Sequence, residues 1–326
     1  MIISRTPYRI SLFGGGTDFN HWINNHGSNI ISFSINKYCY LIFRELPSFF
    51  NHKHRFVYSD TELVNKYSEI NHPSIRETLK YFNINLGFEL IHYGDLPARS
   101  GLGSSSSFTV GLVSAINYLY NKKFTKKKIS KTAILIEQNL IKENVGSQDQ
   151  IAVTYGGLNN IIFSKKNDFR VNKITLSNKN LKNFEDSMML VYSGIDRESN
   201  LIQKSIKKNN VNNSYLKKIH EISLEAKNYF NDSTFDIQSI GNLLNDSWEF
   251  KKKLSPIINK DITQKIIEKA KEVGIYGAKV IGAGSGGFVL LIFPKKNKTN
   301  LEKSLHNYIT LSFKIDFKGN QILLPT

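Results

Sequence analysis

The segment 97-PARSGLGSSSS-107 is the most informative stretch of this 326-residue chain. It follows the apolar run GFELIHYGDLP and precedes SFTVGLVSAINYLYNKK, whose apolar residues recur at helical spacing. Glycines at 101 and 103 let the backbone approach a ligand closely. A helix that begins near residue 104 presents unpaired N–H groups and the positive end of its dipole. Because such an end binds anions, the segment predicts a phosphate-binding loop.

Two other interpretations of this loop can be weighed on the sequence alone. One serine could simply cap the helix, but four consecutive serines exceed what a cap needs. A Walker A loop requires a lysine followed by Ser or Thr at the start of the helix, and no lysine lies between Asp95 and Asn121. Any nucleotide must therefore be held by a different architecture.

Two further glycine clusters are present, each with a plain alternative. Arg9 is followed by 12-LFGGGTD-18, which can curl around a ligand or form a β-turn with an Asx cap. The late cluster, 282-GAGSGG-287, formally satisfies G-x-G-x-x-G. A dinucleotide fingerprint must open a helix, however, and the FVLLIF that follows is strand-like. A glycine-rich hairpin turn is the alternative for this cluster.

Composition narrows the class of protein. With 40% hydrophobic residues the chain can bury a core, and no apolar run is long enough for a membrane span. Arginines interrupt the N-terminal MIISRTPYRISLFGG, so we expect no export signal and a cytoplasmic location. Cys39, the only cysteine, excludes an internal disulfide.

The formal charge of +17 suits nucleic acid or phosphorylated small molecules as a binding partner. The lysines are scattered along the chain, however, and we therefore expect no nucleic-acid partner.

The pattern along the chain predicts two domains, residues 1–170 and 171–326. Composition changes between about 165 and 185, where alternating strand-like and helix-like segments give way to longer polar helices. The sequence predicts strands at 2–13, 38–46, 55–58, 87–93, 187–194 and 312–317, and helices at 104–121, 129–143, 198–208, 214–230, 235–254 and 261–273.

Taken in order, the three clusters resemble the GHMP kinases, the family of galacto-, homoserine, mevalonate and phosphomevalonate kinases. The P-x-x-x-G-L-G-S-S signature of that family is matched by Pro97 to Ser105, and its late glycine loop by Gly282 to Gly287. The resemblance spans essentially the whole chain. It implies an ATP-dependent small-molecule kinase of α+β class with two domains and an active site in the cleft between them.

The resemblance also implies a role for individual residues. Asp149, within GSQDQ, matches the catalytic aspartate, although some relatives lack a usable base, and Arg9 matches a basic residue near the transferring phosphoryl group. Ser105 and Glu137 match the residues that bind Mg²⁺. A turn acid is the alternative for Asp149, and a solvated helix face for Glu137. The implied ATP-binding residues are Pro97, Ser100, Gly101, Leu102, Gly103, Ser104, Ser105 and Ser106; the implied substrate-binding residues are Gly15, Gly16, Thr17, Asp18, Gly284 and Ser285.

Within the family, RTPYRISLFGGGTDF and 245-NDSWEFKKKLS-255 are similar to the branch that includes kinases of D-glycero-D-manno-heptose 7-phosphate. Galactokinases carry an acidic-His pair where this chain has Gly15 and Gly16, which argues against galactose. The expected reaction is phosphorylation of the anomeric hydroxyl of that heptose phosphate. A substrate phosphate would need a second basic pocket, for which Arg99, Arg197 and Lys252 are candidates on composition only.

Two alternatives stay open at this point. The chain could be a kinase of another sugar such as fucose, or a catalytically silent sugar or nucleotide sensor. The presence of both Glu137 and Asp149 disfavours the sensor. The sequence leaves the oligomeric state open, a homodimer included.

Overall fold

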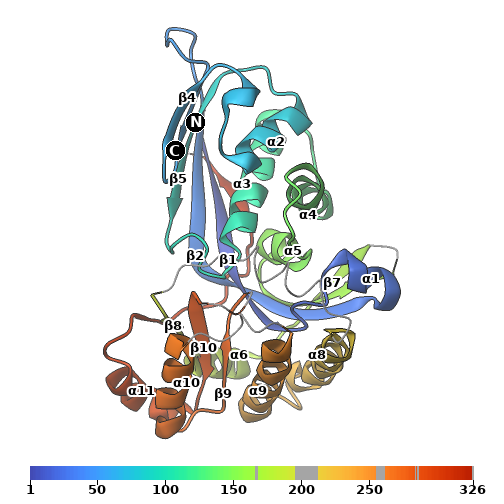
Figure 1. Cartoon of the computed structure of the whole chain (residues 1–326), viewed down its shortest axis with the longest axis vertical. Coiled ribbons are helices and arrows are strands. Elements are labelled where there is room, and N and C mark those ends of the chain that lie inside the picture. Colours follow the sequence, from blue (N-terminus) through green and yellow to red (C-terminus); the bar gives the residue numbers. More distant parts are fainter. Residues whose placement is uncertain (166–167, 195–211, 255–260, 283, 285, 325–326) are drawn as a thin grey trace.

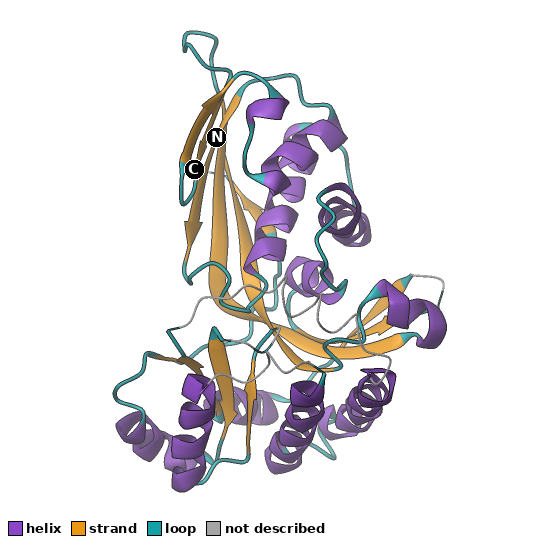
Figure 2. Ribbon diagram, viewed as in Figure 1, coloured by secondary structure: helices purple, strands orange, loops and turns teal. Residues whose placement is uncertain are grey.

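A computed structural model describes residues 1–165, 168–194, 212–254, 261–282, 284 and 286–324 (Figure 1). It contains two β-sheets, each accompanied by helices, and this arrangement confirms the α+β fold class. Figure 2 shows the long strands β1 and β2 curving from the larger sheet toward the half that holds the smaller one. No helix in the described ranges is long and apolar enough to cross a membrane.

The larger sheet has eight strands and runs in the order β12-β1-β2-β5-β3-β4, with β6 paired to β2 and β7 paired to β6. All its pairings are antiparallel except that of β3 with β5. Its strands are β1 (Ile2–Phe13), β2 (Ser28–Glu45), β3 (His54–Val57), β4 (Thr61–Val64), β5 (Phe88–Gly94), β6 (Leu158–Phe163), β7 (Phe169–Lys173) and β12 (Gln321–Leu323).

Helices cover one face of the larger sheet (Figure 1). The central one, α3 (Ser104–Leu119), packs on β1 and β2, and its residues 106–116 are all buried. A helix of mostly small and apolar residues suits this place, because other helices enclose it opposite the sheet. The remaining helices of this half are α1 (Asn20–His26), α2 (Pro73–Phe82), α4 (Lys126–Leu135), the π-helical turn Ile136–Leu140 and α5 (Gln148–Tyr155).

The smaller sheet is antiparallel, in the order β11-β8-β10-β9. One of its two inner strands, β10, is entirely buried, as the uninterrupted apolar run FVLLI predicts. The strands are β8 (Met188–Tyr192), β9 (Gly277–Val280), β10 (Phe288–Ile292) and β11 (Thr310–Leu311), and the helices are α6 (Asn178–Asp186), α8 (Asn212–Ala226), α9 (Ile237–Lys253), α10 (Asp261–Val273) and α11 (Lys298–Ser304).

Two strand predictions are wrong for identifiable reasons. β2 begins at Ser28, ten residues before the predicted start, because its first half carries polar side chains that look like a loop. These side chains are buried because β1 and β6 flank this part of β2. The predicted strand at 312–317 forms only one isolated bridge, between Ile315 and Ile35. Its alternating Phe313 and Ile315 are buried by packing instead of by a ladder. The helix predicted at 198–208 lies outside the described residues.

The two halves are connected by more than one passage of the chain. Residue 170, the predicted domain boundary, falls within β7 of the larger sheet. The strand β12, near the end of the sequence, pairs with β1 in that same sheet. The boundary in sequence therefore stays a prediction, while the two-sheet architecture is observed.

Candidate functional site

The loop between β5 and α3 lies at the end of the larger sheet that faces the smaller half (Figure 1). Gly101 and Gly103 have φ angles of 91° and 77°, which favour glycine. Gly103 occupies the N-cap, and no side chain caps α3. The first helical bond runs from Ser107 N to Gly103 O at 2.8 Å, so the amides of the preceding serines have no partner within the helix. The loop thus provides backbone donors for an anion.

The remaining residues of this loop differ in their exposure. Leu102 and Ser100 are buried, and the Leu102 carbonyl accepts a bond from Arg9 N at 2.9 Å, which fixes the loop to β1. Ser104 Oγ accepts a bond from Arg99 N at 3.2 Å. Pro97 and Ser105 are exposed. The loop therefore has a fixed inner edge and an open outer edge.

Arg9 and Asp149 form a bidentate ion pair next to the loop. Arg9 Nε lies 2.7 Å from Asp149 Oδ1, and Arg9 Nη2 lies 2.5 Å from Asp149 Oδ2. The third arm, Nη1, donates to the Gly101 carbonyl at 2.7 Å. Arg9 is nearly buried, whereas the Asp149 side chain keeps 26% exposure. The carboxylate is therefore held in one orientation and still faces solvent.

The glycine loop after β1 folds back on its own backbone. Gly14 and Gly16 have φ angles of 82° and 106°. A side chain at Gly14 would lie 2.1 Å from the Asn29 carbonyl oxygen, so only glycine fits there. Thr17 is buried, and its hydroxyl bonds to Gly14 O at 2.8 Å and to Ser28 Oγ at 2.6 Å. The Thr17 side chain therefore shapes the loop from inside.

Asp18 joins this loop to the start of α5. It is 2% exposed, and its carboxylate accepts bonds from Gly16 N at 2.9 Å and Gln148 N at 3.3 Å. Burial, followed by the nearby Asp149 carboxylate, raises the pKa of Asp18 above its ordinary value. A side chain at Gly146 would lie 1.8 Å from Asp18 Oδ2, so the two segments are in close contact. Asp18 thus places Asp149 relative to the glycine loop.

Glu137 is a fully buried carboxyl on the π-helical turn Ile136–Leu140. Its Oε2 accepts bonds from Ser106 Oγ at 3.0 Å and Gln150 Nε2 at 2.5 Å. Its Oε1 has no hydrogen-bond partner among the described residues. Burial, and next the charge of Glu143, raise the pKa of Glu137 to about 8. An orphaned buried oxygen of this kind fits a hard cation, which would favour the ionised form.

The serine that contacts Glu137 is Ser106, whereas the exposed Ser105 points to no protein acceptor among the described side-chain bonds. Within the described ranges, no group of three His, Cys, Asp or Glu residues could hold a metal alone. Mg²⁺ commonly takes its other ligands from substrate phosphates and water. The residues present therefore fit a cation that arrives with a nucleotide.

The smaller half approaches the site through two buried lysines that the sequence did not single out. Lys279, on β9, donates to Leu12 O at 2.6 Å and Ser11 O at 3.4 Å. Burial, and then the charges of Lys251 and Arg9, lower its pKa well below the ordinary value. Lys251, on α9, donates to the Gly282 carbonyl. A lone lysine inside the apolar run AKVIG was the signal available in the sequence.

The 245–255 segment supports the late glycine turn. Asn245 bonds to the backbone of Tyr276 and Ala278 at 3.0 Å and 2.9 Å, and so braces β9 before that turn. Gly284 is buried with a φ of 99°. Ser285 and Arg197 lie outside the described residues. Of the other two candidates for a second phosphate, Arg99 is exposed and Lys252 is paired with Glu249 at 2.7 Å.

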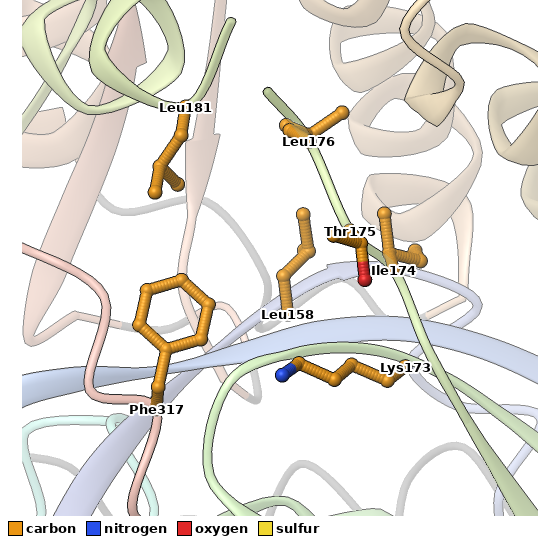
Figure 3. A pocket seen from close by; sticks show the side chains of 7 residues that line it. All are labelled: Leu158, Lys173, Ile174, Thr175, Leu176, Leu181 and Phe317. Atoms are coloured by element: carbon orange, nitrogen blue, oxygen red, sulfur yellow. The ribbon is translucent and has the colours of Figure 1, made fainter. Parts of the chain in front are cut away.

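A pocket elsewhere in the fold contains none of these residues (Figure 3). It is mostly apolar, and its only charged side chain is Lys173. Its lining is Leu158, Lys173, Ile174, Thr175, Leu176, Leu181 and Phe317. We assign no chemistry to it.

Comparisons with known proteins find one family in both halves of the chain. Models of the GHMP kinase N-terminal domain and of the GHMP kinase C-terminal domain match residues 71–157 and 226–308. D-glycero-alpha-D-manno-heptose 7-phosphate kinase of Campylobacter jejuni is 29% identical over 93% of this chain and 93% of its own length. Mevalonate kinase of Methanocaldococcus jannaschii is 29% identical over 72% of this chain and 71% of its own.

One solved structure shows the same fold along the whole chain. It is a D-glycero-D-manno-heptose 1-phosphate kinase from Bacteroides thetaiotaomicron, with a TM-score of 0.79 and 22% identity. It covers 100% of both chains. The two-domain fold that the sequence predicted is thereby confirmed.

Proposed function

Because the chain belongs to the GHMP kinase family and is thus an ATP-dependent phosphotransferase, we propose that it phosphorylates a sugar phosphate, with D-glycero-D-manno-heptose 7-phosphate as the first candidate. The anomeric hydroxyl is the proposed acceptor. One observation carries the proposal. The bidentate Arg9–Asp149 pair lies against the same glycine loop whose amides open α3.

The nucleotide phosphates would bind the amides of the loop from Gly101 to Ser105. The N-terminus of α3 supplies the positive end of a helix dipole, and its first amides have no helical partner. The open outer edge at Pro97 and Ser105 leaves room for the nucleotide to enter. We include the following residues in this phosphate-binding loop: Ser100, Leu102, Gly103, Ser104 and Ser106. The Leu102 side chain is buried, so this residue would contribute only its backbone.

Mg²⁺ would be held by Glu137 together with a serine hydroxyl of the first turn of α3, and it would neutralise charge on the β- and γ-phosphates. Glu137 suits this role because its Oε1 is buried without a partner among the described residues. Ser106 already donates to Oε2, and Gln150 donates there too. These two donors fix the carboxylate and leave Oε1 as the oxygen that would bind the ion.

Phosphoryl transfer consists mostly of positioning and charge neutralisation. The acceptor oxygen attacks the γ-phosphorus, the bond to the β,γ-bridging oxygen breaks, and ADP leaves. Asp149 orients the attacking hydroxyl and takes its proton as the new bond forms. Arg9 holds the Asp149 carboxylate with two arms and lies next to the developing charge. Because Asp149 keeps 26% exposure, an acceptor can reach it.

The proposed sugar site lies between the glycine loop and the smaller half. The backbones of Gly15 and Gly16 border it, and Thr17 and Asp18 hold that loop in place. Gly284 and Ser285 are proposed to close it from the other side. The identity of the sugar rests on the similarity to the C. jejuni relative over 93% of the chain. A cytoplasmic location, where ATP is made, is part of the proposal.

The substrate is tested by an ATP-consumption screen over sugars and sugar phosphates, with the product's regiochemistry read by phosphorus NMR. We expect heptose 7-phosphate to give a 1,7-bisphosphate and to exceed free fucose and galactose by at least about tenfold in kcat/KM. Preferred turnover of fucose would replace the proposed substrate. ATP binding without turnover of any sugar would indicate a silent sensor.

Glu137→Gln tests the cation site. We expect the Mg²⁺ concentration for half-maximal activity to rise by about tenfold or more, because a neutral amide is a poorer ligand for a hard cation. Ser105→Ala and Ser106→Ala form a matched pair that identifies the serine ligand. The family pattern predicts the larger shift for Ser105, whereas the bond to Glu137 favours Ser106. An unchanged Mg²⁺ dependence in Glu137→Gln would remove this carboxylate from the site.

A further inference from the structure

Two buried polar side chains beside the Arg9–Asp149 pair each have an oxygen atom without a hydrogen-bond partner among the described residues. Ser11 is 5% exposed and Gln148 is 6% exposed. Ser11 Oγ and Gln148 Oε1 have no hydrogen-bond partner among the described residues. Burying a polar group without a hydrogen-bond partner costs free energy of folding. Two such groups next to a reaction centre therefore indicate that a ligand supplies the missing partners.

Both side chains are directed by the elements that carry them. Ser11 is two residues after Arg9 on β1, so the two side chains emerge on the same face of the strand. Gln148 directly precedes Asp149 in the first turn of α5. Its side-chain amide donates to the Asp18 carboxylate. That bond fixes which end of the amide is the donor and leaves Oε1 as an acceptor.

Gly15 lies against both of these side chains. A methyl group added at Gly15 would lie 3.0 Å from Ser11 Oγ and 3.5 Å from Gln148 Nε2. Gly14 and Gly16 have positive φ angles that require glycine, but Gly15 does not. Backbone conformation therefore does not account for the missing side chain at this position, whereas the close approach of Ser11 Oγ does.

We propose that Ser11 and Gln148 form a recognition site for the sugar hydroxyl vicinal to the one that is phosphorylated. The vicinal hydroxyl donates to Gln148 Oε1 and bonds to Ser11 Oγ, while its neighbour faces Asp149. The ligand class is a polyol with two adjacent hydroxyls. This inference rests on the proposed function, because it deepens the same acceptor site.

The test compares the heptose 7-phosphate with its 2-deoxy analogue, since C2 carries the hydroxyl next to the anomeric one. For the wild type we expect kcat/KM to be about 10- to 100-fold lower with the deoxy analogue. In Gln148→Met, which has no amide oxygen, the difference between the two substrates should shrink to about threefold or less. If Gln148 had a purely structural role, the substitution would lower kcat/KM equally for both substrates. The ratio of the two kcat/KM values would then stay unchanged.

Gly15→Ala provides a second variant that keeps both side chains. Its methyl group crowds Ser11 Oγ and the Gln148 amide, so we expect KM for the sugar to rise about tenfold while KM for ATP stays within twofold. Ser11→Ala should reduce the preference for heptose 7-phosphate over the 2-deoxy analogue, as Gln148→Met does. Ser114→Ala is its matched control, because it removes an equally buried hydroxyl without a described partner from α3. Thermal melting of each variant separates misfolding from lost recognition.

The outcomes separate this inference from the proposed function. One combination of results would overturn the hydroxyl site alone. In it, the wild type turns over the sugar, Gln148→Met keeps the wild-type ratio of the two kcat/KM values, and Gly15→Ala keeps the wild-type KM for the sugar. If the enzyme turns over another sugar, the same comparison is made with that sugar and its deoxy analogue. The analogue lacks the hydroxyl next to the one that is phosphorylated. Failure of the wild type on every polyol in the screen would overturn both proposals.

Discussion

Asp149→Asn is expected to lower kcat by about 10²- to 10⁴-fold, with the dissociation constant of ATP unchanged within about threefold. The amide keeps the shape of the side chain but cannot accept the proton of the attacking hydroxyl. It also abolishes the ion pair with Arg9, whose contacts lie at 2.7 Å and 2.5 Å, because the neutral amide keeps only one acceptor oxygen. Steady-state kinetics and nucleotide titration give the two quantities.

Asp18→Asn serves as the matched control for this variant. Asp18 is 2% exposed and bonds to the backbone of Gly16 and Gln148, so it acts on Asp149 through the position of α5. We expect a smaller loss of kcat in Asp18→Asn together with a lower melting temperature. Wild-type turnover by Asp149→Asn would remove the base assignment and leave an orienting role at most.

Arg9→Met is the second variant with a large expected effect, a fall of kcat by about 10³-fold. The substitution removes a guanidinium that holds Asp149 with two arms and the Gly101 carbonyl with the third. Arg9→Lys keeps the positive charge but not the fork, so we expect it to recover only part of the loss. Full recovery by lysine would show that charge alone suffices.

The pair also predicts non-additive kinetics. Because Asp149 and Arg9 act as one unit, the double variant Arg9→Met/Asp149→Asn should lose little more than the worse single variant. If the loss of kcat in the double variant equalled the product of the two single losses, the two residues would have independent roles. Melting temperatures of the three variants are the check that the site remains folded, since Arg9 is nearly buried.

Much of the fold followed from local pattern. β1 was predicted at 2–13, as observed, and α3 to within two residues of its end. Both have strong signals, a bounded apolar run and apolar residues at helical spacing. The first half of β2 was missed because sheet neighbours, and not its own residues, bury its serines and asparagines. The return of β12 to β1 has no local signal at all.

The candidate site shows the same division. Family motifs marked Arg9 and Asp149, and the structure brings them into contact across 140 positions of sequence. The sequence could not show that Ser106 is the serine that meets Glu137, because four identical residues offer no basis for a choice. Nor could it show that Lys279 bonds to β1, because a lysine in a short strand normally faces solvent.

The most direct test is a crystal structure of the protein with a non-hydrolysable ATP analogue and Mg²⁺. We expect the triphosphate to lie against the amides of Gly101 to Ser105, with its γ-phosphate facing the carboxylate of Asp149. A triphosphate bound elsewhere, or an Asp149 carboxylate turned away from the γ-phosphate, would contradict it.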